Sequence, residues 1–464
     1  MVFSSLTFLF LFLPLAVIPY YLWNNRTWRN GLLLVLSLFF YAWGEPKFVV
    51  MMVLATLIAY LGGLGMEASQ GKKKKAIFLT AVALIVLNLL VFKYTNFFWD
   101  NLSALFSIHQ EIRQIALPIG ISFYTFQILS YVIDLYFGRV ALQRNFFHLL
   151  LYVSFFPQLI AGPIVRYSTI EEEILHRKES WEDVEVGLKR FILGLAKKVL
   201  LANNAAAIAE IIYTGNVEVY GTAMYWLAAF AYTMQIYFDF SGYSDMAIGL
   251  GRMFGFHFLE NFNYPYVSKS ATEFWRRWHI SLSSWFRDYV YIPLGGSRVS
   301  KAKWVRNILV VWGLTGFWHG AEWNFILWGL YYAALLVLEK FVLGKLLDKL
   351  PTPVRWLYAF LVVNLGWVLF NLVDFSQLAH ALHTMFVWQP TSLAQVLAAD
   401  SGVLYALLYL PICFLLSFPV FPKLPRKEGP VWALVYDALY GILFLTCIVC
   451  IVSSVYNPFI YFRF

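Results

Sequence analysis

The sequence predicts an all-α, polytopic membrane protein, and three observations support this fold class. Hydrophobic residues make up 61% of the 464 residues and charged residues only 13%, whereas soluble domains carry about 45–50% and about 25%. Several apolar runs reach the roughly 18 to 20 residues that a helix needs to cross a bilayer. The basic residues behind the net charge of +9 lie in short segments between these runs, a pattern typical of cytoplasmic loops and not of nucleic-acid binding.

The apolar runs are expected to form membrane spans within a single membrane-embedded domain, residues 1–464. The first run has no basic leader and no small-residue cleavage site, so it is expected to be retained. The expected spans are residues 5–23, 31–43, 47–63, 76–93, 116–136, 222–239, 304–317, 323–342, 353–370, 402–419 and 431–455.

Two segments between these spans differ in character. In "FFHLLLYVSFFPQLIAGPIV" (146–165), Pro157, Gly162 and Pro163 predict a broken or re-entrant segment. Residues 166–200 carry charges at helical spacing, which predicts one or two amphipathic helices at the cytoplasmic interface. These helices could serve as a solvated linker or as a partner-binding surface.

Basic residues also predict the orientation of the chain. The four lysines at 72–75 are placed in the cytoplasm, and counting back three spans puts the N-terminus outside. No Lys or Arg occurs between residues 356 and 422, so the loop after the span 353–370 is expected outside. The last span then runs outward, and the C-terminus is expected on the extracytoplasmic face.

The stretch "YFDFSGYSDMAIGLGRMFGF" places ionisable groups within or against a span. Asp239 and Asp245 alternate with Ser241 and several glycines. A charged side chain at the centre of a bilayer costs at least ~2.5–3.5 kcal/mol, so it is rarely kept without a role. The glycines suggest irregular backbone. We expect a structural polar core in which these carboxylates bind the glycine-rich backbone or Arg276, with no direct catalytic role.

The stretch "EFWRRWHISLSSWFRDYVYIPLGGSR" mixes arginines with tryptophans. Arg276, Arg277 and Arg287 occur here together with Trp278. This composition is typical of an interfacial helix beside an anionic group. Binding of an anionic substrate and anchoring to lipid headgroups both fit it.

His319 lies in the most apolar surroundings of any histidine, in "GLTGFWHGAEWNFILWG". Two imidazoles on adjacent segments, His319 and His279, suit abstraction of a proton from a hydroxyl group. A hydrogen-bonded core histidine is the structural alternative. A metal site with Glu322 is disfavoured, because membrane diiron enzymes need several His-rich clusters. Glu322 is therefore grouped with the polar core, and no metal is expected.

Three cysteines, Cys413, Cys447 and Cys450, lie in apolar runs. The last two have CxxC spacing, but no polar residue stands beside them. Buried apolar thiols are expected in place of a redox or zinc site.

Six stretches together resemble the membrane-bound O-acyltransferase family, and in particular its bacterial branch of alginate and peptidoglycan O-acetyltransferase membrane subunits. The likeness covers at least residues 1–345. The stretches, in order, are "LPIGISFYTFQILSYVIDLY" (117–136), "LIAGPIVR" (159–166), "QIYFDFSGYSDMAIGLG" (235–251), "NFNYPY" (261–266), "EFWRRWHISLSSWFRDYVYIPLGG" (273–296) and "GFWHGAEWNFILWG" (316–329).

The resemblance implies roughly 11 to 13 helices, with re-entrant segments, around a transmembrane tunnel. Residues 237–329 would form the tunnel and catalytic core, in the cytoplasmic membrane of a bacterium and in contact with its lipids. The family's invariant histidine falls on His319 and its second functional position on His279. The resemblance also implies acetyl-CoA as the acyl donor and no permanently bound cofactor.

The last residues, 457–464, look like the short aromatic motif of such systems, in which a tyrosine is proposed to carry the acyl group. Here that residue is Tyr461. An aromatic belt at the membrane interface is the alternative. A phenol is a poor nucleophile until a base removes its proton, a role that His319 could fill.

The predicted activity is acetyl transfer from acetyl-CoA to an extracytoplasmic polysaccharide such as alginate or peptidoglycan. His319 acts as general base and His279 positions the reactants or stabilises the oxyanion. An extracytoplasmic SGNH or esterase-like transferase is the expected partner. A transporter or exporter of a polymer or its acyl donor, and a lipid O-acyltransferase, remain alternatives. The expected substrate-binding residues are Arg276, Arg277, Arg287, Trp278 and Trp318.

Overall fold

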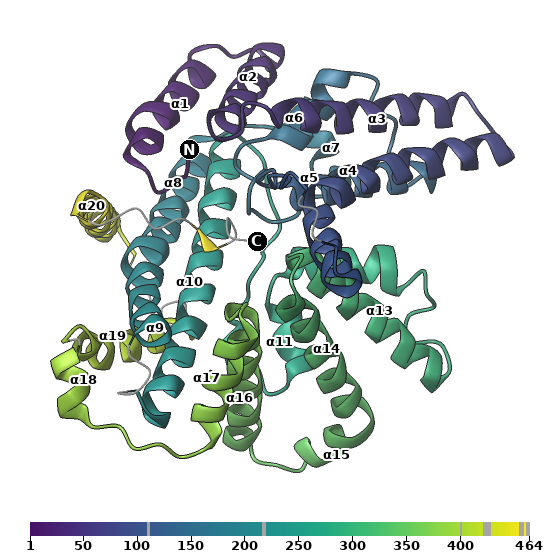
Figure 1. The fold of residues 1–464 in the computed structure, drawn as a ribbon. Helices are drawn as coiled ribbons and strands as arrows, with labels where there is room; N and C mark the ends of the chain where they lie inside the picture. Colours follow the sequence, from purple (N-terminus) through teal and green to yellow (C-terminus); the bar gives the residue numbers. More distant parts are fainter. Residues whose placement is uncertain (109–111, 216–219, 400, 421–427, 454–458, 461–464) are drawn as a thin grey trace. The chain divides into compact units, whose positions relative to one another are not determined.

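The computed structural model describes residues 1–108, 112–215, 220–399, 401–420, 428–453 and 459–460, and all regular structure in these residues is helical (Figure 1). Over the described residues, each expected span lies mainly on a helix or on two consecutive helices. The chain divides into two compact units. Unit 1 holds Met1–Leu193 and Tyr243–Leu259, and unit 2 holds Gly194–Gly242 and Glu260–Phe464.

Unit 1 contains the helices of the N-terminal part of the chain and the end of a long helix from the middle of it. The helices that lie wholly in unit 1 are η1 (Phe8–Phe12), α1 (Leu13–Leu22), α2 (Arg26–Gly44), α3 (Val49–Glu67), α4 (Gly71–Phe106), α5 (Ile121–Tyr136), α6 (Phe146–Ser154) and α7 (Tyr167–His176). Two longer helices, α8 (Trp181–Ala196) and α10 (Thr222–Met253), have residues in both units.

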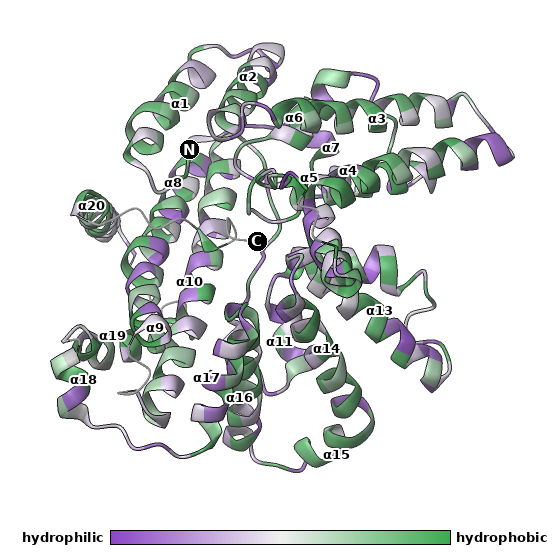
Figure 2. Cartoon of the chain, in the orientation of Figure 1, coloured by the Kyte–Doolittle hydropathy of each residue, from purple (hydrophilic) through white to green (hydrophobic). Residues whose placement is uncertain are grey.

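The lysine run lies inside a helix. Residues 72–75 form the first turn of α4, which begins at Gly71, because lysine is a good helix former. The chain reverses just before it, at residues 68–70. Figure 2 shows this start of α4 as a hydrophilic patch on otherwise hydrophobic helices.

The broken segment predicted within residues 146–165 is confirmed. Helix α6 ends at Ser154, and the following residues are buried but not helical. Buried non-helical backbone needs partners from its surroundings. The N–H of Phe156 donates to Ser37 Oγ at 3.1 Å. A Cβ at Gly120 would lie 2.9 Å from the carbonyl oxygen of Leu159, so glycine is needed where α5 begins.

A cluster of charges joins α1, α2 and the α7–α8 loop in unit 1. Glu179 accepts from Arg26 Nη1 and from the Tyr20 hydroxyl, both at 2.6 Å, and pairs with Arg29 at 2.9 Å. Burial alone would raise the pKa of Glu179. Hydrogen bonds from Arg26 and Tyr20, with the charges of Arg26 and Arg177, lower that pKa below its ordinary value.

The glycine-rich part of α10 is a continuous helix, so the expectation of irregular backbone there is wrong. Within unit 1, a Cβ at Gly249 would lie 2.5 Å from the carbonyl oxygen of Gly187. Within unit 2, a Cβ at Gly242 would lie 2.7 Å from the carbonyl oxygen of Gly194. The glycines therefore allow close approach of α8 to α10.

The amphipathic segment also differs in extent from the prediction. Residues 166–200 do contain two helices, α7 and α8, but the second continues through η2 (Lys197–Ala202) and α9 (Asn203–Thr214). The combined helix is long and apolar enough to cross a membrane.

Unit 2 holds the remaining helices. These are η3 (Pro265–Val267), α11 (Ala271–Arg277), α12 (Ile280–Phe286), η4 (Arg287–Tyr291), α13 (Lys301–His319), α14 (Trp323–Leu338), η5 (Glu339–Leu343), α15 (Gly344–Leu347), α16 (Thr352–Asn371), α17 (Phe375–Phe386), α18 (Leu393–Ala399), α19 (Val403–Leu416) and α20 (Pro430–Ser453).

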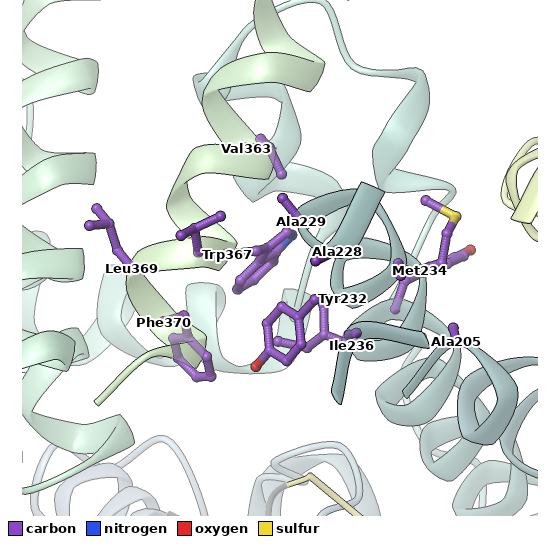
Figure 3. Close-up of a cluster of buried hydrophobic side chains, with 14 of the residues drawn as sticks. Ala205, Ala228, Ala229, Tyr232, Met234, Ile236, Val363, Trp367, Leu369 and Phe370 are labelled. Atoms are coloured by element: carbon purple, nitrogen blue, oxygen red, sulfur yellow. The ribbon is translucent and has the colours of Figure 1, made fainter. Parts of the chain in front are cut away.

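The core of unit 2 is aromatic. Trp367 and Phe370 of α16 lie beside Ala228, Ala229 and Tyr232 of α10 (Figure 3). Small side chains on α10 leave space for the large rings of α16, as dense interior packing requires.

Six helices among the described residues are long and apolar enough to cross a membrane. Together with two shorter apolar helices, Phe8–Leu22 and Val403–Leu416, they support a multi-pass membrane protein. The six are Val49–Glu67, Gly71–Phe106, Trp181–Thr214, Trp323–Leu347, Thr352–Asn371 and Pro430–Ser453.

Candidate active site

His319 is the last residue of α13 and is 5% exposed. Its ring centroid lies 4.9 Å from that of Trp318, 5.1 Å from that of Trp328 and 5.3 Å from that of Phe370. An imidazole enclosed by aromatic rings is removed from bulk water, which strengthens its interactions with any polar group placed beside it.

Glycines bring α13 and α14 together around His319. A Cβ at Gly316 would collide with the carbonyl oxygen of Phe325, and a Cβ at Gly320 would collide with the ring of Phe325. Gly320 also ends α13 with extended backbone. The chain therefore turns directly after the histidine, which fixes the ring at the end of a rigid helix.

His279 stands at the junction of α11 and α12 and is 1% exposed. Its backbone is left-handed, with φ +45° and ψ +55°, a conformation that costs on the order of 1–3 kcal/mol for a residue other than glycine. The N–H of Ile280 donates to the carbonyl of Asn261 at 2.9 Å, and the N–H of Asn263 donates to the carbonyl of Arg277, also at 2.9 Å. These bonds hold the strained residue in place.

Asn261 sets the tautomer of His279. Its Oδ1 accepts the backbone N–H of Ser281 at 3.2 Å and the Ser281 hydroxyl at 2.9 Å. Because a backbone N–H can only donate, this atom must be the amide oxygen. His279 Nδ1 lies 3.1 Å from the same oxygen, so Nδ1 carries the proton and Nε2 is the acceptor nitrogen. An acceptor nitrogen cannot donate to an oxyanion, so the oxyanion role predicted for His279 is disfavoured by this geometry.

The structure brings both histidines into contact with Trp318. The ring centroid of His279 lies 6.1 Å from that of Trp318, which lies 4.9 Å from that of His319. Phe240 of α10 lies edge-on against His279, with centroids 4.7 Å apart. The two imidazoles, which are 40 residues apart in sequence, therefore belong to one aromatic cluster.

The predicted substrate-binding residues separate into exposed and buried groups. Arg276 and Arg287 are exposed, whereas Arg277 is partly buried and pairs with Glu273 at 3.0 Å. Trp278 is 1% exposed. The arginines could meet an anionic group at the surface, while Trp278 packs in the core, where its ring centroid lies 4.7 Å from that of Trp367.

Glu339 fixes the start of α11 and was not identified from the sequence. Its carboxylate accepts the N–H groups of Ala271 at 2.6 Å and of Thr272 at 2.9 Å. It also accepts the Thr272 hydroxyl at 2.6 Å. A carboxylate at a helix N-terminus satisfies backbone donors and favours the helix dipole, so Glu339 holds the short helix that leads to His279.

The residues grouped as a polar core have different surroundings. Asp239 pairs with Lys198 at 2.5 Å, and Asp245 pairs with Arg190 at 2.9 Å. Ser241 is buried. Glu322 is exposed, so its assignment to a buried core is wrong. Neither Lys198 nor Arg190 was named from the sequence, although both are charges within a long helix.

Tyr461 lies outside the described residues, and its role stays a prediction. The three cysteines are free thiols, of which Cys413 and Cys447 are buried. Among the residues that the structure describes, no group of three or more His, Cys, Asp or Glu could hold a metal ion.

Comparison with known proteins places this arrangement in a family. The profile of the membrane-bound O-acyltransferase family matches residues 35–371, a range that contains both histidines, Asn261 and Glu339. The chain belongs to this family. It is a multi-pass membrane O-acyltransferase, and its relatives belong to the bacterial branch.

Three relatives illustrate this branch. A probable alginate O-acetylase AlgI of Pseudomonas putida is 41% identical over 491 aligned positions that cover both chains completely. The protein of the same name from Azotobacter vinelandii is 46% identical over 80% of this chain and 75% of its own. A peptidoglycan O-acetyltransferase of Helicobacter pylori is 34% identical over 80% of this chain and 77% of its own.

Proposed function

We propose that this membrane O-acyltransferase takes the acetyl group of cytoplasmic acetyl-CoA and passes it outward for O-acetylation of a cell-envelope polysaccharide. The observation that carries the proposal is the pair of buried imidazoles, His279 and His319, which both contact Trp318. Relatives named alginate O-acetylase are 41–46% identical and one named peptidoglycan O-acetyltransferase is 34% identical. Alginate is therefore the first polysaccharide to test as the final acceptor.

The proposed reaction begins with proton transfer to His319. The acceptor hydroxyl gives its proton to the imidazole, and its oxygen attacks the thioester carbonyl carbon. The C–S bond breaks, and the coenzyme A thiolate leaves with the proton that His319 took up, which returns the imidazole to its neutral form. Nε2 of His279, as an acceptor, takes a hydrogen bond from an amide N–H of the pantetheine arm of acetyl-CoA and so positions the thioester beside the hydroxyl group. The enclosing aromatic rings exclude water, which would otherwise hydrolyse the thioester.

The arginines bind the donor at the cytoplasmic side in this proposal. Arg276 and Arg287 are exposed, and guanidinium groups bind phosphates through paired hydrogen bonds. The diphosphate of acetyl-CoA would stay at the surface while its thioester reaches the histidines through a tunnel.

The first acceptor in the proposal is the phenol of Tyr461, in the aromatic motif at residues 457–464. An extracytoplasmic SGNH or esterase-like transferase then takes the acetyl group to the polysaccharide. The protein lies in the cytoplasmic membrane, with both termini on the extracytoplasmic side.

The test uses detergent-solubilised protein and acetyl-CoA labelled in the acetyl group. Release of coenzyme A and label on the protein are both measured. His319→Ala should reduce both by at least about 100-fold, the lower range for a general base. His176→Ala is the matched control, because its side chain is 66% exposed.

The outcomes separate the rival functions. Coenzyme A release by His319→Ala at the wild-type rate would overturn the proposed mechanism. Label in lipid would indicate a lipid O-acyltransferase, and no thioester cleavage by the wild type would indicate a transporter. Tyr461→Phe tests the carrier separately: unchanged acetylation of the polysaccharide with the partner present would remove only the tyrosine step.

A further inference from the structure

A buried ion pair lies at the crossing of the long helices in unit 2. Lys198 of η2 and Asp239 of α10 are joined by an Nζ–Oδ1 distance of 2.5 Å, and their side chains are 3% and 2% exposed. A Cβ at Gly242 would lie only 3.2 Å from the backbone nitrogen of Lys198, so the glycine allows the approach. Burying two charges is expensive unless further hydrogen bonds satisfy them.

The second oxygen of this carboxylate binds the carboxyl-terminal segment. Asp239 Oδ2 accepts the backbone N–H of Ile460 at 2.6 Å, across 221 residues of sequence. Lys198 Nζ lies 4.8 Å from the ring centroid of Phe459, within the range of a cation–π contact. Phe459 and Ile460 are 2% and 4% exposed. One ion pair therefore contacts two successive residues of the segment.

These contacts define the register of the segment. The carboxylate binds a main-chain N–H and the ammonium binds the ring of the preceding residue. A shift of the segment by one residue in either direction would place Pro458 or Ile460 at the cation in place of a ring, so the two contacts together distinguish this alignment from its nearest alternatives. A hydrogen bond to a charged acceptor is also roughly twice as strong as one between neutral groups.

Asp239 directly precedes a residue of the histidine cluster. Phe240 follows Asp239 on α10, and its ring lies edge-on against His279 at 4.7 Å. Adjacent residues of an α-helix are separated by about 1.5 Å along its axis. The segment is therefore bound at the turn of α10 that contacts the candidate active site.

We infer that the Lys198–Asp239 pair is a docking site for the carboxyl-terminal segment and positions the residue after Ile460, which is Tyr461, for acyl transfer. The positioning part of this inference rests on the proposed function, in which Tyr461 receives the acetyl group. Lys198 and Asp239 are positioning residues, since they act through the segment and not on the reacting atoms.

Docking is tested by the chemical accessibility of position 460. In a chain whose native cysteines Cys413, Cys447 and Cys450 are replaced by Ala, Ile460→Cys keeps the backbone N–H and places a thiol at a buried site. Removing both charges with Lys198→Met and Asp239→Asn should raise the rate of maleimide labelling at least tenfold. The matched control is Arg190→Met with Asp245→Asn, which removes an ion pair between α8 and α10 and should leave the rate unchanged.

Positioning is tested by Ile460→Pro and Ile460→Ala. Both shorten the side chain, but only proline removes the N–H that Asp239 binds. Acetyl transfer to the tail should be at least tenfold slower in the proline variant than in the alanine variant. Coenzyme A release by the chain with its native tail, with and without His319→Ala, is measured in parallel, because it tests the proposed function without any change at position 460.

Each outcome bears on one part of the inference. Equally slow labelling of the Ile460→Cys variant with and without the Lys198–Asp239 pair would overturn docking. Positioning would be overturned if labelling of the Ile460→Cys variant becomes fast without the ion pair but the proline and alanine variants transfer acetyl to the tail at equal rates. Wild-type release of coenzyme A by His319→Ala would instead remove the proposed function and leave the docking result standing.

Discussion

Replacement of Asn261 by Ala tests the tautomer argument directly. The substitution removes the oxygen that accepts from His279 Nδ1 and from the Ser281 backbone N–H. A buried donor without an acceptor costs ~1–3 kcal/mol. The Ser281 hydroxyl also donates to this oxygen but can rotate away, so the two N–H donors predict a loss of about 2–6 kcal/mol in the free energy of unfolding. A water molecule entering the space would bring the loss toward the lower end.

The effect on activity comes from the imidazole. Without an acceptor at Nδ1, the proton of His279 can move to Nε2, and the acceptor nitrogen that positions the thioester is lost. Misplacement of a reactant by about 1 Å can cost on the order of 100-fold in rate, so coenzyme A release by Asn261→Ala should fall about 100-fold. Asn261→Asp keeps an oxygen at the same place and should retain the Nδ1–H tautomer.

Three measurements separate positioning from folding. Thermal unfolding in detergent gives the stability, coenzyme A release gives the rate, and ring-nitrogen chemical shifts of ¹⁵N-histidine give the tautomer. A carboxylate beside His279 raises the pKa of the imidazole, so the acid limb of the Asn261→Asp rate profile should move to higher pH. If Asn261→Ala is destabilised yet releases coenzyme A at nearly the wild-type rate, the tautomer has no role in the reaction.

Other parts of the structure give three further expectations. Glu339→Gln should cost ~1–3 kcal/mol, because an amide cannot accept all three hydrogen bonds at the start of α11, and coenzyme A release should fall with it. Gly316→Ala should lose about 1–3 kcal/mol in a denaturant titration through its clash with Phe325, whereas Gly313→Ala on the same helix, with nothing within 4 Å, should not. The pKa of Glu179 is lowered in the folded state, so its stabilisation is complete above the unfolded value of about 4.3. That stabilisation is lost as pH falls through the lower folded pKa; Glu179→Gln should lack this part of the acid-induced drop in melting temperature.

The helices could be predicted because their signal is apolar length. Backbone N–H and C=O groups in a bilayer have no water to bind, so a long apolar run must pair them internally, which a helix does. The same principle explains why the glycines of α10 misled the prediction. Glycine costs about 1 kcal/mol in a helix relative to alanine, but breaking the helix would leave several backbone groups without partners. Gly242 and Gly249 therefore remain helical and appear as contact points with α8.

The site was predicted in part. His319 stands out because imidazoles are rare in such apolar sequence, and His279 was paired with it as a second imidazole on an adjacent segment; both lie in the aromatic cluster. Asn261 does not stand out, because its contact with His279 depends on the path of a loop and on the left-handed backbone of His279. A single sequence reveals neither feature. Lys198 carried a usable signal, since it lies in a continuous apolar run, "FILGLAKKVLLANNAAAIAEII". Assigning residues 166–200 to the membrane interface obscured that signal.

Two ion pairs of α10 should contribute differently to stability. The Arg190–Asp245 side chains are 27% and 17% exposed, and exposed pairs contribute about 0–1 kcal/mol. The Lys198–Asp239 side chains are 3% and 2% exposed, so this pair depends on the additional hydrogen bond from Ile460. The pair and the segment should therefore stabilise each other.

A double-mutant cycle measures that coupling. Deletion of residues 459–464 should destabilise the wild type more than it destabilises the Lys198→Met, Asp239→Asn variant, because only the wild type retains a buried carboxylate that loses its donor. Contacting groups in one hydrogen-bond network typically couple by about 0.5–3 kcal/mol, which denaturant titration of the four proteins can resolve. An equal loss of unfolding free energy in both backgrounds would mean that the buried charges and the carboxyl-terminal segment are independent. Other contacts would then have to stabilise the buried ion pair.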